Sequence, residues 1–155
     1  MALLVRSRDA RIGGTHKPSS VEIRDVYHVL VPVDESESRA RTQAEAVAAL
    51  PAANEAVEAT LLHVFTDNPS GASVTQLGAV RRAREVLEDA DVEVRLDEAS
   101  GAPAEEVVER ARGLDVDCIC VAGRKRSPAG KALFGSVSQD VILDSDRAVL
   151  FAHGE

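Results

Sequence analysis

The sequence lacks long apolar runs. None approaches the roughly 18 residues that a transmembrane helix needs. Residues 1–5 are apolar, but the stretch is short and Arg6 closes it, which does not suit a secretory signal. We therefore expect a cytoplasmic protein with no membrane partner.

Cysteine and histidine are also scarce. Cys118 and Cys120 lie two apart in a predicted strand, so their side chains point to the same face and cannot easily bridge each other. We expect two buried thiols. The four histidines are scattered along the chain, and no cluster has the spacing of metal ligands. The sequence thus offers no metal site.

Positive charge is in short supply. Lysine and arginine number 18 against 26 acidic residues, which gives a net charge of −8 over 155 residues. Such an acidic chain is poorly suited to bind nucleic acid through a broad basic face. Of its three lysines, Lys125 and Lys131 fall within one short loop. That loop needs an explanation.

The length fits one domain, which we place at residues 27–154. Residues 1–26 show no hydrophobic periodicity and contain Gly13-Gly14, Pro18 and Ser19-Ser20. Few contacts would hold such a segment, so we expect a disordered N-terminal extension.

From Tyr27 onward, apolar strands alternate with amphipathic helices. The helices are expected from Asp34–Ser38 to about Leu50, over about 73–90, from Pro103 to Gly113, and over about 136–144. The strands are expected at 28–33, 58–65, 92–97, 118–122 and 147–152. Because 92–97 alternates apolar and polar residues, it is expected at an edge of the sheet.

This alternation predicts an α/β fold of the Rossmann-like kind. Right-handed crossovers would make a single-domain, doubly wound, five-stranded parallel sheet with helices on both faces. In such sheets ligands bind beyond the carboxyl ends of the strands, where the winding reverses. With strand order 3-2-1-4-5, Asp34 after the first strand and Gly123 after the fourth would be neighbours at that point.

The segment after the fourth strand is typical of a phosphate site. Gly123 opens a loop that carries Arg124, Lys125, Arg126 and Lys131 and no acid, and Gly135-Ser136 then starts a helix. Backbone N–H groups at a helix start lack internal partners, so an anion can approach them while the cations neutralise its charge.

Several nucleotide and catalytic motifs are absent. No glycine follows the first strand as a dinucleotide fingerprint requires. Six residues, rather than four, separate Gly123 from Gly130-Lys131, and Ala132 follows, which excludes a Walker A loop. No Gly-x-Ser-x-Gly elbow is present and no general base is evident. We expect no enzymatic activity, or at most slow, incidental ATP hydrolysis.

Four segments together resemble the universal stress protein (UspA) family. They are Val29–Asp34 (VLVPVD), Leu61–Val64 (LLHV), Val121–Gly123 (VAG) and Phe134–Val137 (FGSV). The resemblance covers about residues 27–152 and implies an adenine nucleotide alpha hydrolase-like fold. It also implies a stress-response module that binds ATP or AMP, with or without Mg²⁺, between the first and fourth strands.

The resemblance assigns parts of the nucleotide to particular residues. Asp34 and the backbone near Val64 would face the nucleoside, and Pro32 and Ala122 would line the base pocket. Ribose and phosphates would meet the loop and the last helix, at Gly123, Arg124, Arg126, Gly130, Lys131, Gly135, Ser136 and Val137.

The loop departs from the pattern of ATP-binding members, which is Gly-x-x-Gly, nine residues, then Gly-Ser/Thr. Arg126 stands at the second glycine, and eight residues separate it from Gly135. The loop is therefore either a variant phosphate cradle or one that no longer binds. Asp34 and Ser136 could also serve only as helix caps.

The apolar sequence of the last strand predicts that two copies of the chain associate. Its residues are apolar and it is expected at a sheet edge, a pairing hazard that a symmetric dimer removes. The resemblance also implies a homodimer through this strand. The alternative function is a structural or regulatory dimer without nucleotide, whose cationic loop binds a partner protein or a small anion. The expected interface residues are Ala148, Val149, Leu150, Phe151 and Ala152.

Overall fold

The computed structural model describes residues 26–67, 71–125 and 132–154. The predicted disorder of the N-terminal extension concerns residues that lie, apart from Val26, outside this description. No helix among the described residues is both long and apolar enough to cross a membrane.

Five of the six strands in the sheet are parallel, as predicted. Their order is β3-β2-β1-β4-β6, so the last strand of the chain lies at one edge and β3 at the other. The predicted fold class and strand order 3-2-1-4-5 are confirmed. The strands are β1 (Tyr27–Pro32), β2 (Val57–Phe65), β3 (Glu93–Ser100), β4 (Cys118–Lys125) and β6 (Ala148–Gly154).

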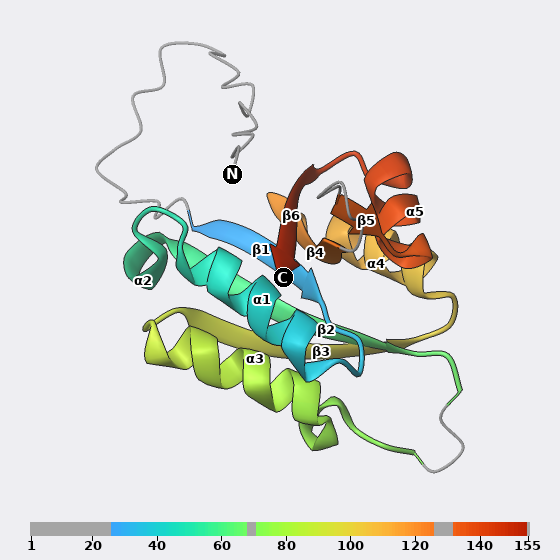
Figure 1. The fold of residues 1–155 in the computed structure, drawn as a ribbon, viewed down its shortest axis with the longest axis horizontal. Coiled ribbons are helices and arrows are strands. Elements are labelled where there is room, and N and C mark those ends of the chain that lie inside the picture. Colours follow the sequence, from blue (N-terminus) through green and yellow to red (C-terminus); the bar gives the residue numbers. More distant parts are fainter. Residues whose placement is uncertain (1–25, 68–70, 126–131, 155) are drawn as a thin grey trace.

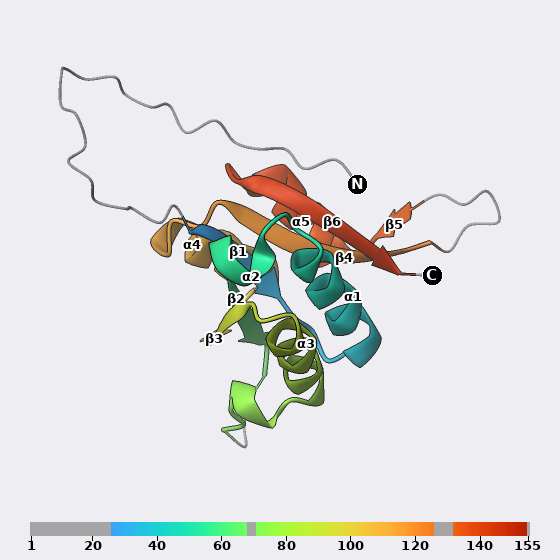
Figure 2. The same ribbon diagram turned by 90° about the vertical axis from the view of Figure 1, so that its left-hand side faces the viewer.

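Helices cover both faces of the sheet (Figures 1 and 2). One face packs against α1 (Glu37–Ala48) and α3 (Gly78–Asp89), and the other against α4 (Pro103–Gly113) and α5 (Ser136–Asp144). The buried side chains form two apolar clusters, one on each side.

Three local features differ from the sequence-based expectations. The segment predicted as one helix from residue 73 begins as a 3₁₀ turn (Val74–Gln76) and becomes α3 only at Gly78. Ser73 and Gln76 form a capping box, which closes the short turn as a separate unit. An additional short helix, α2, covers Ala53–Ala56.

The third difference concerns the cationic loop. β4 continues past Gly123 to Lys125, and a short strand, β5 (Ala132–Phe134), returns antiparallel to it. Since β6 occupies one edge of β4 over Cys118–Arg124, β5 must use the edge that faces β1. The segment is therefore a hairpin at its base rather than an open loop.

At the amino ends of the strands, His28 is half-buried and accepts or donates a hydrogen bond with Thr60 (Nε2 to Oγ1, 2.7 Å). Burial lowers the pKa of His28, with Arg95 acting in the same direction and Glu58 and Asp117 opposing. The folded protein therefore binds a proton at His28 less readily than the unfolded chain does.

This shift predicts a pH dependence of stability. Between the lowered folded-state pKa and the unfolded value of about 6.5, the unfolded chain holds more protons. The free energy of unfolding should therefore fall as the pH is lowered through about 6.5. Urea unfolding at a series of pH values should show a smaller decrease for His28→Gln than for the wild type. Parallel curves for the two proteins would contradict this account.

Candidate functional site

The central strands β1 and β4 part near their carboxyl ends. Their register covers only Val29 with Cys118 and Leu30 with Ile119. Pro32 has no N–H group to continue the ladder. Beyond this point the two strand ends enclose an opening, at the place where the winding of the sheet reverses.

A cavity of about 760 Å³ lies at this opening. Its walls come from the carboxyl ends of β1, β2 and β4 and from the start of α5. The structure brings eight of the residues singled out from the sequence into its lining: Pro32, Asp34, Val64, Ala122, Gly123, Gly135, Ser136 and Val137.

The other four residues of the predicted nucleotide site are the cations and glycine of the loop. Arg124 lies in β4, and its side chain is not described. Arg126, Gly130 and Lys131 lie outside the described residues. The described backbone places both ends of this loop at the cavity, because Gly123 and Phe134 are paired there.

Asp34 is held by two partners at the end of β1. Its Oδ1 accepts a hydrogen bond from the backbone N–H of Ser36 at 2.8 Å. Its Oδ2 accepts from Nε of Arg39 and lies 2.8 Å from Nη2 of the same guanidinium. Asp34 does not cap α1, because Ser36 is the N-cap and accepts from the N–H of Arg39. The paired carboxylate remains about half exposed and lines the cavity.

The start of α5 faces the same cavity without a side-chain cap. Gly135 is the N-cap residue, so the idea that Ser136 caps this helix is wrong. Gly135, Ser136 and Val137 are exposed. Ser138 Oγ donates to the carbonyl of Ala122 at 2.8 Å, which ties the helix start to the end of β4. The first N–H groups of α5 are thereby positioned beside the cavity and open to an anion.

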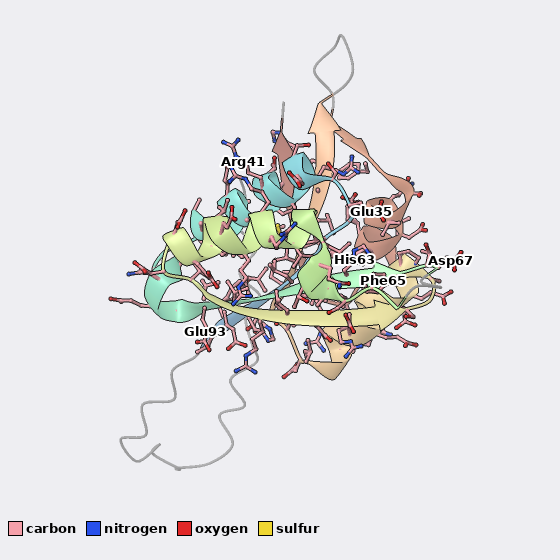
Figure 3. All side chains as sticks on the ribbon, turned by 90° about the horizontal axis from the view of Figure 1, so that it is seen from below. Glu35, Arg41, His63, Phe65, Asp67 and Glu93 are labelled. Atoms are coloured by element: carbon pink, nitrogen blue, oxygen red, sulfur yellow. The ribbon has the colours of Figure 1, made fainter. Side chains whose placement is uncertain are left out.

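Further lining residues were not singled out from the sequence. Figure 3 shows Glu35, His63, Phe65 and Asp67 together at one end of the molecule, away from Glu93. Arg39 and Gln43 also line the cavity, from α1. The sequence did contain a sign that Gln43 is buried, because this polar residue lies on the same helix face as Ala40, Ala44 and Val47. Arg39 could not be distinguished from other surface arginines.

His63 is buried, and its orientation follows from its partner. Nδ1 lies 2.7 Å from the carbonyl oxygen of Val33, so this nitrogen carries the hydrogen and donates. In the neutral ring Nε2 is then the acceptor. Phe65 packs edge-on against the imidazole, with ring centroids 4.6 Å apart. His63 thus fixes the turn after β1 against β2.

The charges of the described lining are unevenly distributed. Asp34, Glu35 and Asp67 lie at the ends of β1 and β2, and Arg39 is the cation among the described lining side chains. The start of α5 carries no acid in its first turn. Within the described residues, no group of histidine, cysteine and acidic side chains is arranged to hold a metal ion. The geometry therefore suits an anion at α5 and an uncharged polar group near β1 and β2.

Comparison with known proteins assigns the family. The universal stress protein family model matches residues 26–153, which is most of the chain. The chain belongs to the universal stress protein family. A curated relative, the stress response protein NhaX of Bacillus subtilis, is 32% identical over 71 residues. That match spans 46% of this chain and 43% of NhaX, less than half of either protein.

Three solved universal stress protein structures share the fold. A complex with cAMP is 24% identical, with a TM-score of 0.65, and the match covers 84% of this chain and 99% of that one. A complex with dAMP from Archaeoglobus fulgidus is 20% identical (TM-score 0.63; 83% and 98% covered). The Arabidopsis thaliana protein with AMP bound is 14% identical (TM-score 0.59; 83% and 92% covered).

Proposed function

We propose that this universal stress protein is a stress-response module that binds an adenine nucleotide, ATP or AMP, between the ends of β1 and β4. The observation that carries the proposal is the cavity itself. It joins an uncapped helix start, a fixed carboxylate and an apolar slot, three features that a phosphate, a ribose and a purine each require.

Family members crystallised with cAMP, dAMP and AMP support this reading. These ligands share an adenine base and a phosphate on the 5′ carbon. In this chain Pro32, Val64 and Ala122 would enclose the base and Asp34 would accept from ribose hydroxyls. The N–H groups of Gly135, Ser136 and Val137 would hold the phosphate, helped by Gly123, Arg124, Arg126, Gly130 and Lys131.

Two measurements test this proposal. Protein purified from cells is denatured, and the released small molecules are identified by mass spectrometry. Protein freed of nucleotide is then titrated with AMP and with ATP by calorimetry, with and without Mg²⁺. An adenine nucleotide among the released molecules, or saturable heat with either ligand, is expected. Their joint absence would refute nucleotide binding and favour a dimer that works without nucleotide.

Arg39 offers a test of the charge balance at the nucleoside end. Arg39→Ala removes the described cation of the lining and releases Asp34, so AMP affinity should fall about fivefold, as for a partly exposed ion pair worth about 1 kcal/mol. Calorimetry provides the measurement.

Arg41→Ala is the matched control for Arg39. Arg41 lies two residues further along α1, pairs with Glu45 at 2.7 Å and does not line the cavity. Figure 3 shows it on the outer side of the molecule, apart from His63. Both variants change the net charge equally. Equal affinities for AMP would show that Arg39 has no local role.

The homodimer also remains a proposal. Within the described residues β6 pairs with β4 alone, so its other edge is open. Leu150 and Ala152 are buried within their own chain, in the apolar cluster that α1 and α3 cover. A second copy would therefore meet the β6 backbone together with the half-buried Ala148, Val149 and Phe151. Sedimentation equilibrium should give about twice the chain mass of 16.5 kDa. A single chain mass would exclude the dimer.

A further inference from the structure

Gln43 is the polar residue most deeply buried near the cavity. It lies on α1, is 2% exposed and lines the cavity. Its Nε2 donates to the carbonyl of Pro32 at 2.7 Å and to the carbonyl of Cys120 at 2.9 Å. One carboxamide thus joins β1 to β4.

The two carbonyls lie just beyond the last paired residues of these strands. The β1–β4 register stops at Leu30 and Ile119, and Pro32 cannot donate to β4. A buried carbonyl left without a hydrogen-bond partner is unfavourable, because it has lost its bonds to water. An amide nitrogen has two hydrogens, and Gln43 uses one on each strand. The side chain therefore supplies the link between β1 and β4 that backbone hydrogen bonds do not make at this level.

A second contact keeps α1 against β4 at the same level. Cys120 Sγ donates to the main-chain carbonyl of Gln43 at 3.8 Å, and the thiol is fully buried. The carboxamide is therefore anchored at its own backbone and at both strands. Pro32, the last residue of β1, and Ala122, two residues beyond Cys120 in β4, both line the cavity. The distance between Pro32 and Ala122 therefore depends on the two hydrogen bonds that Gln43 makes to β1 and β4.

We propose that Gln43 is a positioning residue that sets the separation of the β1 and β4 ends, and with it the width of the slot for the base. This inference rests on the proposed function for the ligand, but not for the strand geometry. Loss of the carboxamide should change how the base fits while leaving the phosphate site at α5 intact.

The test compares Gln43→Met with Thr60→Val. Met keeps the length of the side chain without its donors. Thr60 is 3% exposed and hydrogen-bonded to His28, so Thr60→Val removes a comparable buried bond outside the cavity. We expect Gln43→Met to bind AMP at least tenfold more weakly, with little change for ribose 5-phosphate, which lacks the base. Thr60→Val should change neither affinity. Equal losses for both ligands, or equal AMP losses in both variants, would overturn the proposal.

Hydrogen exchange in the absence of ligand keeps this inference separate from the proposed function. The Val33 amide, which donates to the carbonyl of Leu62 at 2.8 Å, reports on the end of β1. It should exchange at least tenfold faster in Gln43→Met than in the wild type and remain unchanged in Thr60→Val. Unchanged exchange in Gln43→Met would overturn the role of Gln43 even if the wild type binds AMP. Faster exchange in Gln43→Met, together with a wild type that binds no AMP, would refute nucleotide binding and retain the role of Gln43 in the strand geometry.

Discussion

Gly135→Glu is expected to weaken AMP binding at least 100-fold while the chain stays folded. The new carboxylate would stand at the start of α5, where the phosphate needs free N–H groups. Two like charges about 4 Å apart near a protein surface repel by roughly 4 kcal/mol, more than a 100-fold loss requires. Calorimetric titration with AMP measures the loss.

The fold should tolerate this change for two reasons. A Cβ at Gly135 meets no atom within 4 Å, and its φ of −69° is allowed for any residue. An acid at a helix start is also favourable to the helix dipole. Thermal unfolding should therefore show a midpoint close to that of the wild type.

Gly113→Glu is the matched control. Gly113 ends α4, is exposed, has open space around its Cβ position and does not line the cavity. The substitution makes the same change in net charge. Gly135→Ala, which adds a methyl group without charge, should fall between the two. If Gly135→Glu and Gly113→Glu bind AMP alike, the α5 start does not hold the phosphate.

Leu150→Lys is expected to unfold the chain rather than to separate a dimer. Leu150 lies on β6, but its side chain is 3% exposed and packs in the cluster beneath α1. Placing an unpaired charge there should cost about 3–5 kcal/mol, a large part of the 5–15 kcal/mol that stabilises a typical domain. Urea unfolding monitored by circular dichroism measures the loss.

Leu143→Lys supplies the comparison at an exposed position. Leu143 on α5 is 71% exposed, so the same chemical change should alter stability by less than about 0.5 kcal/mol. A folded Leu150→Lys protein with near wild-type stability would contradict the packing of β6. Sedimentation of that variant would then be informative about the dimer, which it otherwise cannot test.

The sheet could be predicted because its strands carry their own signals. Val29–Val31 and Leu61–Leu62 are apolar runs buried on both faces, whereas Glu93–Ser100 alternates as an edge strand does. The turns and helix starts between them predicted a doubly wound parallel sheet, within which the order 3-2-1-4-5 was the expectation. The location of the site followed from that topology, since Asp34 and Gly123 end neighbouring strands.

The details that depend on tertiary contacts could not be predicted in this way. The Asp34–Arg39 pair requires the first turn of α1 to fold back beside β1. The bridge from Gln43 requires Pro32 and Cys120 to be adjacent, though they are far apart in sequence. The hairpin of β4 and β5 was not expected, because the glycine and proline of the connecting segment predict irregular structure. Local sequence patterns do not identify partners that are distant along the chain.

Amide chemical shifts during an AMP titration test the central claim most directly. Nucleotide binding between β1 and β4 predicts saturable shifts at Val64, Gly123 and Ser136, which line the cavity from three different elements. Gly113, outside the lining, should not move. Absence of saturable shifts, or shifts confined to residues outside the cavity, would contradict the account.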